Sequence, residues 1–92
     1  MASLNAQEAK DRLSKLSGWE IDDGELVKIF TFPDFRAALG FVNRVGETAE
    51  SAGHHPDIDI RYNQVHLALV THDAGGLTDK DFDLAAKADR LV

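Results

Sequence analysis

The chain is 92 residues long and 43% hydrophobic, so it is expected to form one small globular domain with a modest core of its own. It contains no cysteine, which excludes disulfides, a thiolate nucleophile and a zinc site that uses cysteine. Its formal net charge of −6, without a cluster of lysine and arginine, argues against nucleic acid or an anionic membrane as a partner.

No apolar run approaches the ~18 residues of a transmembrane helix, and the first residues lack the basic-then-apolar pattern of a secretion signal. We therefore predict a cytoplasmic protein. There is also no linker, low-complexity tract or repeat, so residues 1–92 are predicted to form a single domain.

The first predicted element is a short amphipathic helix. Asn5 and Glu8 have the spacing of a capping box, which predicts that a helix begins here, and Gly18 marks its end. Apolar positions between these signals recur at helical spacing and are Ala6, Ala9, Leu13 and Leu16.

A β-hairpin is predicted next, over residues 19–32. Asp23-Gly24 is a strong two-residue turn signal between its two strands. The return strand from residue 25 to 32 is apolar on both faces, with Val27 and Ile29 on the face opposite to its other apolar residues. A strand of this kind is usually covered on both sides, which indicates that a second subunit supplies the other cover.

The longest apolar stripe follows Asp34, which is in the position of a helix cap. The stripe has i, i+3, i+4, i+7 spacing and consists of Phe35, Ala38, Leu39, Val42, Val45, Ala49 and Ala52. Gly53 is placed to end this helix in the left-handed conformation.

The segment from residue 53 to 76 contains all four histidines and two runs with strand-like alternation, at 58–62 and 65–69. Asn63 and Gln64 between them have the right length for a two-residue hairpin loop. These features predict a second antiparallel hairpin.

That loop would place Tyr62 opposite Val65 and would gather the apolar side chains of both strands on one face. If the same ladder continues, His55 lies opposite His72, with His54 one residue away. Three imidazoles are therefore expected to meet at the open end of the hairpin.

A last helix is predicted after Thr78, which with Asp81 resembles an N-terminal cap. Its apolar stripe consists of Leu84, Ala85, Ala88 and Leu91. The order helix, hairpin, helix, hairpin, helix predicts an α+β domain with an antiparallel sheet and the helices packed on one face.

The cluster of His54, His55 and His72 is the candidate site, whereas His66 is interpreted as a surface residue facing Arg61 across the hairpin. Imidazole donates and accepts protons near neutral pH, so several imidazoles without a nucleophile favour acid–base chemistry. Three histidines can also hold zinc, although neighbours in an extended segment point to opposite sides. A structural role is the third interpretation.

Acidic side chains around the cluster are less informative. Glu50 precedes the histidine pair by one helical turn, where it can orient a histidine or bind an amino group. Asp73 is a candidate site residue as the neighbour of His72. Asp57, Asp59 and Asp73 can equally form a solvated strand edge.

Several runs of residues match a known family over nearly the whole chain. They are His54-His55-Pro56, Tyr62-Asn63, Val65-His66, Thr71-His72-Asp73 and Gly76-Leu77-Thr78 with Asp81, together with Gly18-Trp19 and the helix from Phe35 to Val45. On these residues the chain resembles the pterin-4a-carbinolamine dehydratases.

The resemblance implies a four-stranded antiparallel sheet with three helices on one side, assembled into homodimers or homotetramers through sheets and helices. It also implies a hydro-lyase reaction, the dehydration of 4a-hydroxytetrahydropterin to quinonoid dihydropterin in tetrahydrobiopterin recycling. This reaction uses no metal and no organic cofactor.

The resemblance implies that His54, His55 and His72 are catalytic. His54 and His72 would exchange protons near the 4a oxygen, and His55 would mainly position the substrate and act as a base. The backbone around Val70 and Thr71, with Glu50, would contact the pterin.

The chain departs from the family pattern at two positions. Gly53 stands where an acidic residue or asparagine is common, and Ile58 stands where an aromatic is usual. The alternative function is a non-catalytic protein-binding module of the same fold, of the kind that assists transcription-factor dimers. Such a role would use helix surfaces rather than the histidines.

Overall fold

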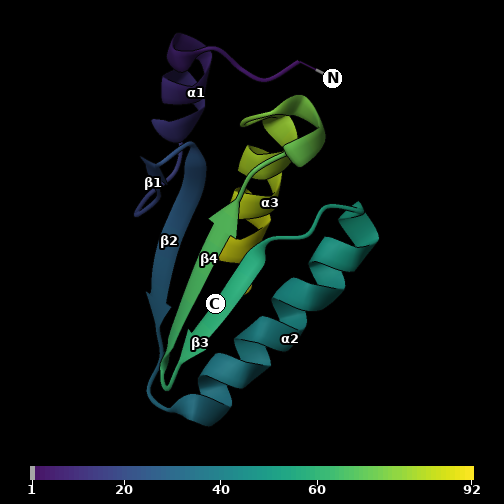
Figure 1. Cartoon of the computed structure of the whole chain (residues 1–92). Coiled ribbons are helices and arrows are strands. Elements are labelled where there is room, and N and C mark those ends of the chain that lie inside the picture. Colours follow the sequence, from purple (N-terminus) through teal and green to yellow (C-terminus); the bar gives the residue numbers. More distant parts are fainter. Residues whose placement is uncertain (1) are drawn as a thin grey trace.

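The computed structural model describes residues 2–92 as a four-stranded antiparallel sheet with three α-helices (Figure 1). The helices are α1 (Ala6–Leu13), α2 (Phe35–Ala52) and α3 (Asp79–Asp89), and the strands are β1 (Glu20–Asp22), β2 (Glu25–Thr31), β3 (Asp57–Arg61) and β4 (Gln64–Leu69). A single turn of 3-10 helix, η1 (His72–Ala74), precedes α3. The predicted α+β fold and its order of elements are confirmed.

The sheet has the order β1-β2-β4-β3, so β1 and β3 are its edges. One face of the sheet is buried, and its core side chains are Leu26, Phe30, Val65, Leu67 and Leu69. All three helices add buried residues to the same cluster, and in Figure 1 α3 lies behind β3 and β4 while α1 stands near one end of β2. The helices therefore cover one face and leave the other face of the sheet open.

Local signals in the sequence fix most element ends. Asn5 and Glu8 form a reciprocal capping box, and Asp34 accepts a hydrogen bond from the Ala37 N–H at 2.8 Å. Gly53 ends α2 with a φ of 64°, the left-handed conformation that glycine adopts without strain. These caps agree with the predictions, although α1 already ends at Leu13.

The loop of the second hairpin differs from the prediction. It consists of Tyr62 and Asn63, one residue earlier than expected, and the ladder pairs Ile60 with Val65. Asn63 is held by β2, because its side-chain amide donates to the Phe32 carbonyl and its own carbonyl accepts from the Phe32 N–H, both at 2.9 Å. This contact from outside the hairpin decides the register.

The register shift of two residues keeps the same side chains on the buried face, because side chains alternate with a period of two. It does, however, remove the predicted pairing of His55 with His72, since the ladder continued to His55 would reach the residue two before His72. It also places His66 opposite Asp59 rather than Arg61.

The buried face of α2 is rotated from the predicted stripe. Phe41, which the stripe omitted, is fully buried together with Ala38, whereas Phe35 and Leu39 are 47% and 41% exposed. The sequence carries two adjacent apolar ridges on this helix, and only the packing against the sheet decides which one is buried. Within residues 2–92, no helix combines the length and apolar character needed to span a bilayer.

Two phenylalanines on α2 test this assignment. We expect Phe41→Ala to lower the free energy of unfolding by about 3–5 kcal/mol, because it empties space in the closed core. Phe35→Ala is the matched control, and we expect it to change stability by only about 0.5 kcal/mol. Urea unfolding, followed by the fluorescence of Trp19, measures the stability of both variants. Repeating it at two protein concentrations separates the effect of association from that of folding. Similar losses in both variants would contradict the packing described here.

Candidate functional site

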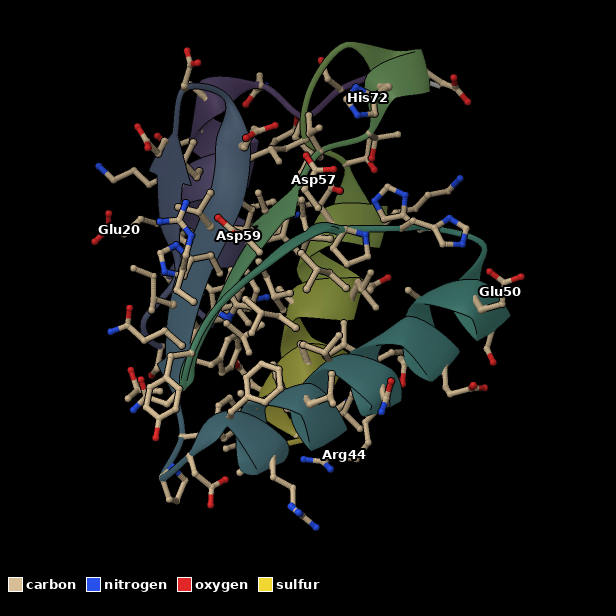
Figure 2. The ribbon with its side chains drawn as sticks, turned by 60° about the horizontal axis from the view of Figure 1, so that its bottom comes forward. Glu20, Arg44, Glu50, Asp57, Asp59 and His72 are labelled. Carbon is tan, nitrogen blue, oxygen red and sulfur yellow. The ribbon has the colours of Figure 1, made fainter. Side chains whose placement is uncertain are left out.

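A hollow of about 280 Å³ lies where the end of α2, the end of β4 and the start of α3 come together. It is lined by His54, His55 and His72 together with Val70, Thr71, Asp73 and Lys80. All three histidines of the predicted cluster therefore border one space. Figure 2 shows His72 on η1 and Glu50 at the end of α2, so the hollow is built from separate elements.

Turns on both sides bring these histidines together, rather than the continued ladder that the sequence predicted. After Gly53 ends α2, the His54 N–H still donates to the Ala49 carbonyl at 3.2 Å, which holds the histidine pair against the helix. On the other side Thr71 forms an isolated bridge with Gly76, and η1 lies in the loop between them. The loop turns His72 back toward the end of α2.

His54 is fixed by a buried carboxylate. Its Nε2 lies 2.6 Å from Oδ1 of Asp81, and the side chains are 12% and 0% exposed. Because a carboxylate only accepts hydrogen bonds, Nε2 of His54 carries the hydrogen. The Nδ1 atom is then the one that can take up or deliver a further proton. A carboxylate that orients a histidine in this way sets both its tautomer and its ring position.

The second oxygen of Asp81 anchors the surrounding backbone. Oδ2 accepts from the Thr71 hydroxyl at 2.8 Å and from the Thr78 N–H at 2.9 Å. Since Thr71 donates to Asp81, the 2.7 Å contact between the two threonine hydroxyls has Thr78 as its donor. Asp81 thus ties the end of β4, the start of α3 and His54 into one buried network.

His55 has a much more exposed partner. Its Nε2 lies 2.8 Å from Oε1 of Glu50, with the two side chains 63% and 80% exposed. An exposed pair of this kind contributes at most about 1 kcal/mol to stability. Glu50 therefore orients His55 without making it rigid, and it does not itself line the hollow.

Two residues at this site, Asp81 and Lys80, are not among the candidate site residues that the sequence predicts. The sequence pattern indicates Asp81 as a helix cap and as one residue of the family resemblance, but its carboxylate also holds His54. Lys80 carries no comparable signal in the sequence, yet it lines the hollow beside the histidines. The available signal for Asp81 was an acid at the third position of a helix whose cap residue already carries a hydroxyl.

His66 lies apart from the cluster on the open face of the sheet, opposite Ile29 and Asp59. Within residues 2–92 no three His, Cys, Asp or Glu side chains converge in a way that could hold a metal ion.

The family model described as Pterin 4 alpha carbinolamine dehydratase matches residues 2–91. A relative from Acidobacterium capsulatum, named "Putative pterin-4-alpha-carbinolamine dehydratase", is 58% identical over 92 residues. The match covers 100% of this chain and 100% of the relative. A relative of the same name from Chloroflexus aurantiacus is 51% identical over 92 residues, which are 100% of this chain and 99% of the relative.

Two solved structures are also similar. The crystal structure of a transcriptional coactivator/pterin dehydratase from Brucella melitensis has a TM-score of 0.93 and 33% sequence identity, over 97% of each chain. A pterin dehydratase-like protein that is a RuBisCO assembly factor in the alpha-carboxysome has a TM-score of 0.65 and 23% identity, over 79% of this chain and 84% of that one. The second likeness shows a shared fold alone.

The α+β fold and the hollow lined by three histidines define a small domain with groups suited to proton transfer at a bound molecule. The chain belongs to the pterin-4a-carbinolamine dehydratase family, as the match over residues 2–91 and the relatives at 51–58% identity show. The family supports a dehydratase, a lyase that acts on a pterin.

The Asp81 network yields a stability prediction. We expect Asp81→Asn to lower the free energy of unfolding by about 1–3 kcal/mol, because an amide group replaces one acceptor oxygen in a buried site filled with donors. Asp83→Asn on the same helix, at an exposed position, is the control and should change stability by about 0.5 kcal/mol or less. Equal effects in urea unfolding would show that the buried network does not stabilise the fold.

Proposed function

We propose that this protein dehydrates 4a-hydroxytetrahydropterin to quinonoid dihydropterin by histidine acid–base catalysis, as part of tetrahydrobiopterin recycling. The reaction breaks the bond between C4a and its hydroxyl group and removes the proton from N5. A C4a–N5 double bond and one water molecule form, with no change of oxidation state. The chemistry therefore requires one proton donor and one proton acceptor, and the proposal includes no metal or organic cofactor.

The observation that carries the proposal is the convergence of His54, His55 and His72 on one hollow. Its volume of about 280 Å³ is near the lower end of the ~300–1,000 Å³ typical of small-molecule pockets, which suits a compact bicyclic ring. Three imidazoles at one small site can deliver a proton and remove another without rearrangement of the protein.

The environments of the histidines support different roles. His54, buried and held by Asp81, offers Nδ1 at a fixed position, and His72 lies on the exposed turn across the hollow. We assign these two to proton exchange near the 4a oxygen. His55, which is hydrogen-bonded to the exposed Glu50, is assigned to positioning the substrate and to acting as a base.

Substrate contacts are proposed on the remaining lining. The backbone at Val70 and Thr71 would contact the pterin ring, with Asp73 at the same rim. Glu50 would act next to His55 rather than from the wall of the hollow. Lys80 is the single basic side chain, lysine or arginine, among the residues that line the hollow. Its ammonium group is suited to bind an electronegative group of the substrate.

We also propose a cytoplasmic homodimer or homotetramer. The support on the molecule is the exposed apolar ridge of α2, where Phe35 is 47% and Leu39 is 41% exposed. Large apolar side chains exposed together commonly mark a contact between proteins.

A kinetic comparison tests the function. We expect the wild-type protein to accelerate dehydration of chemically prepared 4a-hydroxytetrahydropterin, followed by ultraviolet absorbance, and His72→Ala to lose about 10²–10⁴-fold of that acceleration. His66→Ala, which removes a histidine far from the hollow, is the matched control and should keep the wild-type rate. A wild-type rate equal to the spontaneous one would reject the enzyme and favour a binding role.

The oligomer has its own test. We expect light scattering after gel filtration to give twice or four times the 10.1 kDa mass of the chain. Leu39→Glu should reduce that mass, because it places a charge in an apolar contact. Arg36→Glu on the same helix is the control for added negative charge. A wild-type monomer at all accessible concentrations would rule the assembly out.

A further inference from the structure

The open face of the sheet contains a hollow of about 620 Å³, more than twice the volume at the histidines. No helix covers this face, because all three helices pack on the other side. Val27 and Ile29 on β2 and Ala68 on β4 form its apolar centre, and Ile29 is 55% exposed. The hollow is separate from the proposed catalytic site and shares no lining residue with it.

The strand register places acidic side chains on both sides of this apolar centre. One row across the four strands consists of Glu20, Val27, Ala68 and Asp57. The next row on the same face consists of Ile29, His66 and Asp59. Both edge strands therefore contribute carboxylates, and both central strands contribute apolar side chains. Figure 2 shows Glu20 at one margin of the sheet, with Asp59 and then Asp57 progressively farther from it.

Most of these charges have no counter-ion within residues 2–92. Glu20, Asp22 and Asp57 form no salt bridge there, whereas Asp59 pairs with Arg61 at 2.9 Å. That hydrogen bond holds the pKa of Asp59 below its ordinary value. Lys28 also borders the hollow, but its ammonium group lies 2.8 Å from Asp89. The rim is therefore negative.

His66 adds an unsatisfied group to the floor. Its Nε2 is buried and has no hydrogen-bond partner within residues 2–92, although the residue lines the hollow. An unpaired buried polar atom is unfavourable, because it has lost its hydrogen bonds to water without replacing them. A partner that brings a polar group to this position, after a small movement of the ring, would relieve that penalty.

The distance between the two acidic edge strands, β1 and β3, matches the width of one helix. Three intervals of about 4.8 Å separate the backbones of β1 and β3, which gives roughly 14 Å. An α-helix with its side chains is about 10–12 Å across. A helix laid in the hollow would place an apolar stripe on Val27, Ile29 and Ala68, and residues flanking the stripe would reach the carboxylates.

The apolar pattern of strand β2 predicts a second subunit over this face, but the charges on the face disfavour a second copy of this chain. Its own sheet would bring the carboxylates of Glu20, Asp22 and Asp57 against those of the first copy, and the chain carries a net charge of −6. Like charges brought together at an interface repel each other and oppose association. The complementary surface is cationic at its margins and apolar at its centre.

We propose that the open face of the sheet binds an amphipathic α-helix of another protein, whose apolar stripe is flanked on both sides by lysine or arginine. The binding uses Glu20, Asp22 and Asp57 on the two edge strands for the basic flanks, and Val27, Ile29 and Ala68 on the central strands for the stripe. It does not depend on the proposed dehydratase activity, because none of these residues lines the histidine hollow.

A designed peptide tests the proposal. The probe has about 18 residues, enough to form a helix alone, with a leucine stripe flanked by lysines. Added to the ¹⁵N-labelled full chain at low salt, it should shift the amide resonances of β2 and β4 around Val27, Ile29 and His66. A peptide of the same composition in scrambled order, which has no stripe, should bind at least about tenfold more weakly.

Matched charge variants locate the contact. The triple variant Glu20→Gln, Asp22→Asn, Asp57→Asn should weaken peptide binding at least about tenfold while leaving dehydration unchanged. The control Asp11→Asn, Glu47→Gln, Asp83→Asn removes the same charge from the three helices and should bind like wild type. Equal loss in both triples, equal binding of the scrambled peptide, or shifts centred on α2 would overturn the proposal. So would a wild-type oligomer that dissociates when Ile29→Asp is introduced, because a second copy would then occupy this face.

Discussion

The structure depends most on the buried carboxylate of Asp81. It accepts hydrogen bonds from the Thr71 hydroxyl and the Thr78 N–H, and it lies 2.6 Å from Nε2 of His54. A fully buried carboxylate is tolerated only when its oxygens are satisfied, and here three separate parts of the chain satisfy them. The same interaction therefore anchors the start of α3 and fixes one histidine of the proposed catalytic site. Stability and the proposed function are coupled at this one residue.

The proposed catalytic site uses a rigid group beside adaptable ones. His54 is locked in the interior, whereas His55 and Glu50 form an exposed pair and His72 lies on a turn. A fixed imidazole preserves the geometry of proton transfer, and the exposed groups can adjust as the substrate enters and product leaves. Of the two departures from the family pattern, Gly53 lines the hollow beside His54, whereas Ile58 lies on β3 and lines the hollow of the open face. Gly53 also provides the left-handed turn that precedes His54.

The two faces of the sheet differ in composition and burial. The inner face builds the core with all three helices, and one end of that packing supports the histidines. The outer face carries an apolar centre between acidic edges, a pattern that the core does not require. In so small a domain, an exposed Ile29 between carboxylates is explained better by a partner than by the stability of the fold.

Local features of the sequence determined the order of elements, the caps at Asn5, Asp34 and Gly53, the Asp23-Gly24 turn and the residues that carry the family resemblance. These depend on contacts within a few residues, which a sequence displays directly. The tertiary structure alone decided the position of the loop at Tyr62-Asn63 and the burial of Phe41. It also decided the hydrogen bond between Asp81 and His54 and the placing of acidic side chains on both edges of the open face. Each of these results from residues far apart in the chain: Phe32 holds Asn63, the sheet selects one ridge of α2, and strand pairing aligns Glu20 with Asp57. A periodic pattern shows which side chains share one face of a helix or strand. Only the packing between elements decides which other residues that face contacts.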